Sequence, residues 1–385
     1  MSKQIPLFKI FVSREAIKAA SDVLSSNFIG QGPITDEFES RLRGYFDHPY
    51  INTTNSATSA EHLAFQMLKF PNQYTGWRGL TSEDYCLSTP LTCFASHIGP
   101  LAGAGLKIKW VDIDPTTLNM DLDDLERKIT KETKVINLVH WAGNPNDLHK
   151  VKDIQNKTRS MLGFRPEVVE DAAHAFGAKY KGKYIGTHGN LVTFSLQAIK
   201  HLTASDGGLL FSPNPGFHAR SRNLRWFGIN RDDPEKLSLR CDQDIVEAGH
   251  KFHMTDLNAS IGMANLGHID GILNTHKANA KFYDENLKGV PGLTLLKRDP
   301  DSESTHWIYS ILVDHRADFH KWMKECGIAC NQVHERTDNH TCMKEFRSHL
   351  PNMDKVAGSI TNIPVHWAVT EEDRAYIVEK IRMGW

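Results

Sequence analysis

Between about residues 50 and 215, short apolar runs alternate with segments of helical periodicity, and no other feature restricts the fold as strongly. The apolar runs lie at 85–88, 108–113, 135–140, 168–170, 191–196 and 209–211. Helical patterns lie at 57–69, after the capping residues Asn55 and Ser56, and at 121–128. This alternation predicts an α/β fold with three layers, in which helices cover a mostly parallel sheet.

The pattern changes beyond about residue 265. A long polar helix is expected at 271–287, a strand at 305–314 and a last helix at 371–382. The chain has 385 residues, which is more than one ordinary domain needs. We therefore predict a large domain at 1–265, which includes the N-terminal segment, and a smaller α+β domain at 266–385.

Charge and hydropathy argue against several classes of function. The 45 basic and 46 acidic residues give a net charge of −1, so neither nucleic acid nor an anionic membrane is expected as the main partner. No apolar run approaches the roughly 18 residues of a membrane span, and the first residues do not resemble a signal peptide. Cysteine and histidine spacings predict no metal site. We expect a cytoplasmic protein that acts on small molecules.

Open α/β sheets bind ligands at the carboxyl ends of their strands, and polar residues follow three of the apolar runs. Residues 53–60 begin a helix whose positive end suits a phosphate, although an ordinary capped helix would look the same. Asp171 follows a buried strand, where its carboxylate could hold a pyridinium nitrogen or cap a helix. Lys200 follows a second buried strand and lies near Gly207 and Gly208. It is therefore well placed for a Schiff base with an aldehyde cofactor.

These segments resemble the sugar aminotransferases of the DegT/AHBA-synthase type, which are pyridoxal 5′-phosphate (PLP) enzymes with the aspartate aminotransferase fold. The resemblance covers essentially the whole chain. It is carried by NFIGQGPITDEFE and VINLVHWAGNPNDL and most specifically by EDAAHAFGAKYKGKYIGTHGN and FSLQAIKHLTASDGG. It implies fold type I, PLP as the cofactor, and a homodimer whose active sites are shared between subunits.

The resemblance also implies roles for individual residues. Lys200 would form the Schiff base with PLP and carry the proton, and Asp171 would lie against the pyridine nitrogen. The remaining implied cofactor contacts are Thr58, Ser59 and Ser195 at the phosphate, His174 near the ring, and Lys251 from the neighbouring subunit. Lys251 begins a Lys-Phe-His-Met segment where the family commonly has Asn-Tyr-Arg-Met, so a full positive charge replaces an amide there.

Two further observations concern the ring and the substrate. Cys93 lies where many family members carry an aromatic residue that stacks on the cofactor, so either another residue covers that face or the stacking is lighter. Candidate substrate contacts are the 27–33 loop and the side chains of His97, Arg231, His334 and Arg336. Arg336, Arg231 and Arg225 could bind a pyrophosphate or a carboxylate equally well.

The implied reaction moves an amino group from an amino acid, expected to be glutamate, to a keto sugar. A nucleotide-linked 4-keto-6-deoxy sugar is the commonest substrate of the family, in the synthesis of surface polysaccharides or secondary metabolites. The alternatives are another keto sugar such as an octulosonate-type acid, a PLP-binding regulator, and a sugar dehydratase with histidine in place of the lysine. His201 makes the dehydratase worth testing, but counting from Ser195 puts Lys200 at the Schiff-base position.

Overall fold

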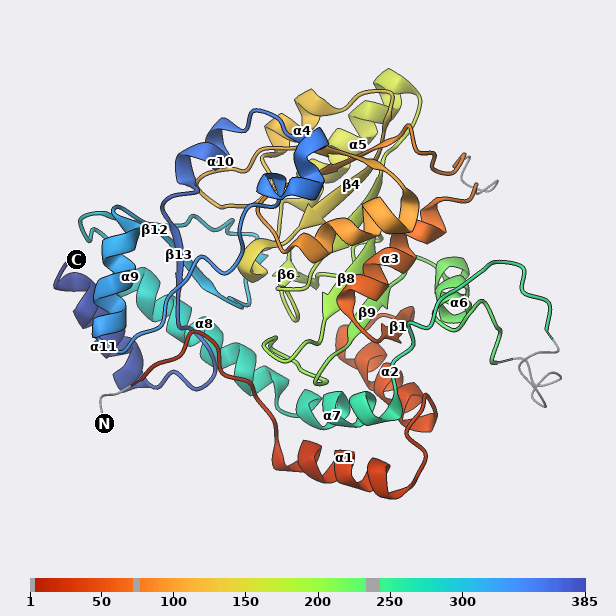
Figure 1. Cartoon of the computed structure of the whole chain (residues 1–385), viewed down its shortest axis with the longest axis horizontal. Coiled ribbons are helices and arrows are strands. Elements are labelled where there is room, and N and C mark those ends of the chain that lie inside the picture. Colours follow the sequence, from red (N-terminus) through yellow and green to blue (C-terminus); the bar gives the residue numbers. More distant parts are fainter. Residues whose placement is uncertain (1–3, 72–76, 233–242) are drawn as a thin grey trace.

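The computed structural model describes residues 4–71, 77–232 and 243–385, and a seven-stranded sheet lies at its centre (Figure 1). The strands in spatial order are β1 (Ile51–Thr54), β9 (Gly208–Phe211), β8 (Leu191–Ser195), β5 (Glu167–Asp171), β4 (Thr133–Val139), β2 (Tyr85–Ser88) and β3 (Lys107–Trp110). β9 is antiparallel to both of its neighbours, and the other pairs are parallel. The predicted mostly parallel α/β sheet is confirmed, and each predicted run overlaps its strand, although the run 108–113 extends beyond β3, which ends at Trp110.

Helices cover both faces of this sheet because its strands are apolar on both sides. Ile136 and Leu138 of β4 face one core with Phe38 of α2, whereas Val135 faces a second core with Leu63 of α3. The helices of this part of the chain are α1 (Arg14–Ser25), α2 (Pro33–Phe46), α3 (Ala57–Leu68), α4 (Leu122–Lys128), α5 (Leu148–Leu162), α6 (Pro215–Leu224) and α7 (Asp256–Leu266). Short helical turns are η1 (Phe94–His97), η2 (Gly99–Ala104) and η3 (Trp141–Gly143).

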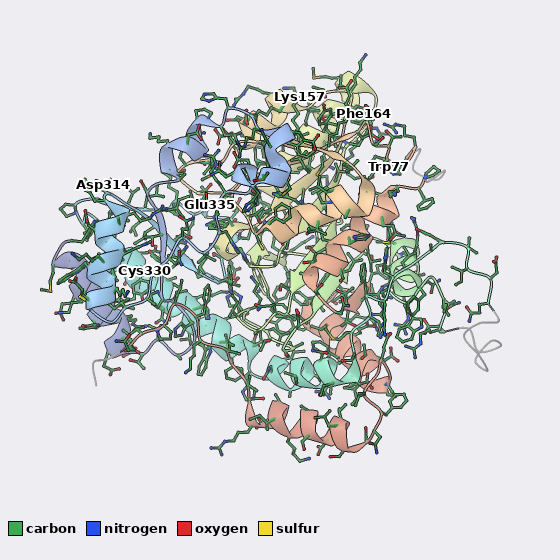
Figure 2. The ribbon with its side chains drawn as sticks, viewed as in Figure 1. Trp77, Lys157, Phe164, Asp314, Cys330 and Glu335 are labelled. Atoms are coloured by element: carbon green, nitrogen blue, oxygen red, sulfur yellow. The ribbon has the colours of Figure 1, made fainter. Side chains whose placement is uncertain are left out.

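The outer helices α4 and α5 are joined through charged side chains. Lys157 of α5 forms an ion pair with Glu126 of α4. Just beyond α5, the ring of Phe164 lies 3.6 Å from Lys134 Nζ (Figure 2). The pair between Lys157 and Glu126 is partly exposed, whereas Lys134 belongs to the central strand β4 and is buried.

The start of α3 lies unusually close to the sheet. Ser56 Oγ accepts a hydrogen bond from Ser59 N at 3.1 Å and thereby caps the helix. In the neighbouring strand β9, a Cβ on Gly208 would lie 2.3 Å from the carbonyl oxygen of Ser56. Only glycine leaves room for this approach, so Gly208 allows the positive end of α3 to reach the edge of the sheet.

Beyond α7, the long helix α8 (Ile269–Asn286) leads to a second sheet. That sheet has the order β10 (Leu293–Leu295), β12 (Tyr309–Val313), β13 (Ile360–Ile363). Around it lie α9 (Arg316–Glu325), α10 (Pro351–Val356) and α11 (Glu371–Arg382), with the turns η5 (Thr337–Asn339) and η6 (Thr341–Phe346). Three short strands, β6 (Lys179–Tyr180), β7 (Lys183–Tyr184) and β11 (Ser302–Glu303), form a third sheet.

The predicted helices of this region agree with α8 and α11, but the predicted strand at 305–314 is too long. His306 has φ = +50°, which extended backbone does not adopt, and β12 begins only at Tyr309. None of the helices in the described ranges is both long and apolar enough for a bilayer span.

The first residues of the chain join its last third. Ile5 forms a parallel bridge with Ile328, and its N–H donates to the carbonyl of Gly327 at 2.8 Å. From there the chain crosses to α1, which packs against α7 (Figure 1). The division into domains at 1–265 and 266–385 stays a prediction.

Candidate active site

Three chain segments with polar residues meet at the carboxyl edge of the central sheet. Asp171 ends β5 and is paired with Thr193 of β8. Ser195 ends β8, and both Ser195 and Thr54 of β1 are paired with Gly208. The strand endings that the sequence singled out therefore lie side by side, and Lys200 follows shortly after Ser195.

Lys200 lies against an aromatic ring that sequence reasoning missed. Its Nζ is 3.4 Å from the centre of the Trp307 ring, and the Trp307 indole donates to the carbonyl of Ile199 at 2.8 Å. Burial lowers the pKa of Lys200 to about 7, although the charge of Asp171 and the thiol of Cys93 act in the opposite direction. A substantial fraction of the amine is therefore neutral at neutral pH, as a nucleophile or base requires.

Asp171 is buried and held by two donors. Its Oδ2 accepts from Ser96 Oγ at 2.5 Å, and its Oδ1 accepts from Ala173 N at 2.9 Å. The Ser96 hydroxyl is also hydrogen bonded to Thr92 Oγ1 at 2.7 Å. This network fixes the direction of the carboxylate and keeps a negative charge near Lys200.

Two histidines complete the cluster around Lys200. The His174 ring stacks on Trp307 with centroids 3.9 Å apart and lies parallel to the His334 ring at 5.6 Å. Burial, reinforced by the nearby Lys200, lowers the pKa of His174 and brings that of His334 to about 4. Both rings are thus neutral at pH 7. His174 Nδ1 is buried and has no hydrogen-bond partner within the described ranges, so it is available to a ligand.

The predicted phosphate residues lie at the start of α3 and the end of β8. Thr58 and Ser59 belong to the first turn of α3, and Ser59 Oγ is 3.0 Å from Ser56 Oγ. Ser195 Oγ accepts from Gln197 N at 3.3 Å. Lys251 is exposed, and its carbonyl accepts from Asn55 Nδ2 at 3.2 Å. Their roles at a phosphate stay predictions.

Three of the four substrate candidates lie outside the Lys200 cluster. His97 is fully buried, its Nε2 is 2.9 Å from Thr337 Oγ1, and burial lowers its pKa to about 3. Arg336 forms ion pairs with Asp338 and Asp354. Arg231 stacks on the Trp226 ring, 4.4 Å from its centre. Only His334 lies beside Lys200, and substrate contact by all four stays a prediction.

His201 has contacts that differ from those of its neighbour Lys200. Its Nε2 donates to the carbonyl of Thr305 at 3.0 Å, and its ring lies 4.6 Å from that of His276. Burial lowers its pKa well below the usual value. The amine of Lys200, not the imidazole of His201, therefore lies against the Trp307 ring, near enough to Asp171 for the charge of that carboxylate to act on it.

Comparison with known proteins agrees with this arrangement. The structure of AtS13 from Actinomadura melliaura is 45% identical in sequence, with a TM-score of 0.94 and 100% of both chains covered. The sugar aminotransferase CalS13 from Micromonospora echinospora is 38% identical, with a TM-score of 0.93 and coverage of 99% of this chain and 100% of the other.

Two curated relatives are nucleotide-sugar aminotransferases by name. The dTDP-4-dehydro-2,3,6-trideoxy-D-glucose 4-aminotransferase of Saccharopolyspora spinosa is 30% identical, over 79% of this chain and 77% of the relative. The UDP-4-amino-4-deoxy-L-arabinose–oxoglutarate aminotransferase of Shewanella sediminis is 29% identical, over 94% and 93%.

Fold and relatives together define the class, which is the PLP-dependent sugar aminotransferases of fold type I. The chain belongs to the DegT/DnrJ/EryC1/StrS aminotransferase family, whose model matches residues 12–382. The predicted activity, transamination on a sugar, and the predicted cofactor are thereby confirmed. The regulator and the dehydratase are not favoured.

The residues at the sheet edge fit PLP. The set contains an amine with a lowered pKa, a fixed carboxylate, a neutral ring with an unused nitrogen, and hydroxyls at the positive end of a helix. The amine suits the aldehyde of PLP and the carboxylate suits its pyridine nitrogen. The neutral imidazole suits the aromatic ring, and the hydroxyls at the helix start suit the phosphate.

The pKa of Lys200 gives a prediction for cofactor uptake. Only the neutral amine attacks an aldehyde, and below its pKa of about 7 the neutral fraction falls about tenfold per pH unit. The rate at which PLP-free protein takes up PLP is therefore expected to rise up to about pH 7 and then level off. Stopped-flow absorbance measures it. A rate that keeps rising towards pH 10, as for an ordinary lysine, would contradict the lowered pKa.

Proposed function

We propose that this protein transfers the amino group of glutamate to the keto group of a nucleotide-linked 4-keto-6-deoxy sugar. Such amino sugars serve surface polysaccharides or secondary metabolites. The position of Lys200 carries the proposal: its partly neutral amine lies on the Trp307 ring, which also stacks on His174, and within electrostatic reach of the fixed carboxylate of Asp171. The named relatives support the substrate class, since one acts on a dTDP-linked keto sugar and the other uses oxoglutarate, the keto acid of glutamate.

When bound, PLP supplies an electron sink that allows a proton to leave the carbon bearing the amino group. Lys200 Nζ is the base that takes this proton and returns it, and burial keeps enough of the amine neutral for that task. Asp171 holds a proton on the pyridine nitrogen through its negative charge, and Ser96 keeps the carboxylate in position. His174 is neutral and held by its stacking on Trp307, and it would contact the cofactor ring.

The phosphate contacts and the oligomer belong to the same proposal. Thr58, Ser59 and Ser195 bind the cofactor phosphate with the N-terminus of α3. The protein forms a homodimer in which Lys251 reaches the partner's cofactor phosphate, in keeping with its exposure. Light scattering measures the dimer, and tight PLP binding by a demonstrated monomer would argue against this role of Lys251.

The experiment that tests the function uses the colour of the PLP-loaded protein. Glutamate alone is expected to bleach the visible absorbance as the amino group moves to the cofactor, and a 4-keto-6-deoxy sugar nucleotide is expected to restore it. Mass spectrometry then detects the amino sugar. An octulosonate-type acid without a nucleotide is the second substrate to screen. Unchanged absorbance with glutamate and other amino acids would contradict a transaminase.

A further inference from the structure

A second carboxyl group lies buried near Asp171, on the helix α3. Glu61 is 3% exposed and lies on the side of α3 that packs against η2. A Cβ on Gly99 of η2 would lie 2.8 Å from Glu61 Cγ, so glycine leaves the room that this side chain occupies. Burial and the charge of Asp171 raise the pKa of Glu61. The two carboxyl groups are therefore close enough to interact.

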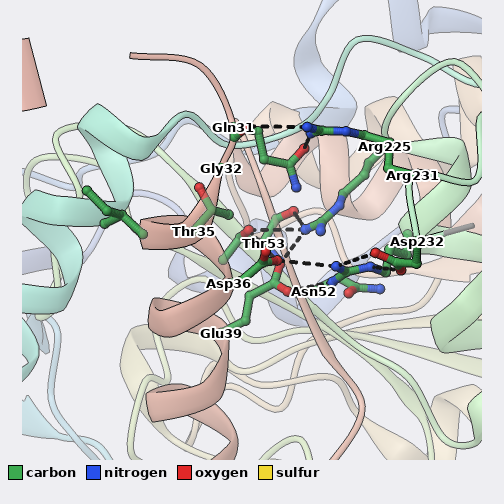
Figure 3. A network of polar contacts seen from close by, with 12 residues as sticks. Gln31, Gly32, Thr35, Asp36, Glu39, Asn52, Thr53, Arg225, Arg231 and Asp232 are labelled. Carbon is green, nitrogen blue, oxygen red and sulfur yellow. Dashed lines mark hydrogen bonds and ion pairs between the residues drawn. The ribbon is translucent and has the colours of Figure 1, made fainter. Parts of the chain in front are cut away.

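Glu61 differs in its partners from Glu39, a buried glutamate of α2. Glu39 forms ion pairs with three arginines, among them Arg225 (Figure 3). Burial would raise the pKa of Glu39, yet Arg225 holds it below the usual value. Among the described residues no cation acts on Glu61, and burial, Asp171 and Cys93 hold its pKa well above the usual value. Glu61 therefore keeps its proton at neutral pH, and Asp171 alone carries the charge of the pair.

An asparagine links Glu61 to Asp171. Asn137 of β4 is fully buried, and its Nδ2 donates both to Glu61 Oε1 at 3.1 Å and to the carbonyl oxygen of Ser96 at 2.7 Å. The hydroxyl of the same serine donates to Asp171 Oδ2 at 2.5 Å. Two acceptors therefore fix the direction of the Asn137 amide, and one of them belongs to the residue that holds Asp171.

The amide of Asn137 depends on these two acceptors for its orientation. Its Oδ1 is buried and has no hydrogen-bond partner in the part of the chain that the structure describes. Without the oxygen of Glu61, one N–H of the amide would also lose its partner in a buried place, which is costly. The amide would then be free to turn, and the carbonyl of Ser96 would lose a donor that holds it in place.

We propose that Glu61 is a positioning residue for the cofactor, which acts through Asn137 and Ser96 to keep the carboxylate of Asp171 aligned with the pyridine nitrogen. This inference rests on the role of Asp171 in the proposed function. A neutral carboxyl group suits the task, because it supplies an acceptor oxygen to Asn137 without adding a second negative charge beside Asp171.

The affinity for PLP tests this inference without any turnover. PLP-free protein is titrated with PLP, and absorbance reports the bound fraction. Glu61→Leu is expected to weaken PLP binding by about tenfold, because Asn137 loses an acceptor and Asp171 loses part of its support. Glu61→Gln keeps an acceptor oxygen in a neutral side chain of the same size and is expected to stay within about twofold of the wild type. Wild-type affinity in Glu61→Leu, or equal weakening in both variants, would overturn the proposal.

Glu167→Leu is the matched control. Glu167 is partly buried at the start of β5, whereas Asp171 ends the same strand. Burial raises the pKa of Glu167 as it does that of Glu61. The control is expected to leave PLP affinity unchanged. Weakening as large as that in Glu61→Leu would overturn the proposal, because the loss of any carboxyl group from this layer would then explain the effect.

Urea denaturation of the PLP-free variants separates positioning from a structural role. Exchanging a buried acid for an apolar side chain of similar size removes a desolvated polar group and usually keeps or raises stability. The midpoint of unfolding of Glu61→Leu is therefore expected to equal or exceed that of the wild type. A clearly lower midpoint would make Glu61 a structural residue and overturn the proposal.

A double variant tests the route through Asp171. Asp171→Asn is itself expected to weaken PLP binding, since it removes the charge that the pyridine nitrogen needs. Adding Glu61→Leu to Asp171→Asn is expected to cause no further loss, because both changes act on the same contact. A further tenfold loss in the double variant, or wild-type affinity in Asp171→Asn, would overturn the inference.

These measurements are independent of the sugar substrate. If the wild type aminates no sugar nucleotide but Glu61→Leu weakens PLP binding through Asp171, the proposed function fails and this inference stands. If the wild type aminates sugar nucleotides but Glu61→Leu keeps the wild-type affinity for PLP, this inference fails and the proposed function stands.

Discussion

Replacing Lys200 by alanine is expected to reduce turnover by about 10⁴-fold or more, since a single group acts as both nucleophile and base. Lys200→Arg is expected to be equally inactive, because a guanidinium keeps its proton at neutral pH. The physical reason is the lowered pKa of Lys200, which gives a neutral amine where an arginine cannot. Steady-state rates with glutamate and a keto sugar measure the loss.

Cofactor attachment is the second readout for these variants. Reduction with borohydride followed by mass spectrometry is expected to fix the cofactor on residue 200 of the wild type and to leave the variants unlabelled. Both variants are expected to bind PLP without a covalent bond, because Asp171 and the start of α3 are unchanged. Lys183→Ala, at an exposed lysine, is the control and is expected to keep full activity. Normal turnover of Lys200→Ala would remove this residue from the mechanism.

Glu39→Gln is expected to lower the free energy of unfolding by about 3–5 kcal/mol, which is the usual effect of removing one partner from a buried ion pair. The substitution leaves the buried guanidinium of Arg225 without a counter-charge, and the side chains of Arg43 and Arg222 lose the same partner. Urea denaturation of the PLP-free protein measures the change. Glu37→Gln, in the exposed pair with Arg41, is the control and is expected to change stability by less than about 0.5 kcal/mol.

The pKa of Glu39 predicts how the stability effect of Glu39→Gln changes with pH. Burial alone would raise the pKa of Glu39, but Arg225, Thr53 and Arg222 together hold it below the usual value. A lowered pKa stabilises the fold above the pKa of the unfolded chain, about 4.3, and the contribution is lost as the pH falls further. The stability difference between the wild type and Glu39→Gln is therefore expected to shrink at acidic pH. A constant difference from pH 7 to pH 3 would contradict this account.

The central sheet and part of the site could be predicted because local patterns determine them. Buried parallel strands carry continuous apolar runs, and their carboxyl ends meet at one edge, so Asp171 and Lys200 could be placed together from their positions alone. α1 and α2 were not predicted. α1 exposes apolar residues such as Ile17 and Leu24 as well as polar ones, so its pattern does not separate a buried face from a solvated one.

The environment of Lys200 could not be predicted because it is built from distant segments. Trp307 contacts Lys200 but lies far from it in the sequence, after the strands of the third sheet. In the sequence alone, Trp307 is one residue of an apolar run and nothing marks it as part of the site. Ser96 contacts Asp171 from a short helical turn that has no clear periodicity. Such contacts depend on tertiary packing, which local propensity does not encode.

The bridge between Ile5 and Ile328 has a consequence for the order of folding. Ile328, the partner of Ile5, is synthesised long after it, so this contact forms late and closes a very long loop. Until Ile328 has been made, Ile5 lacks its β partner. The core cluster that contains Ile5 otherwise consists of residues between Ala280 and Ile381, so it is completed late in synthesis and ties an early segment of the chain to a late one.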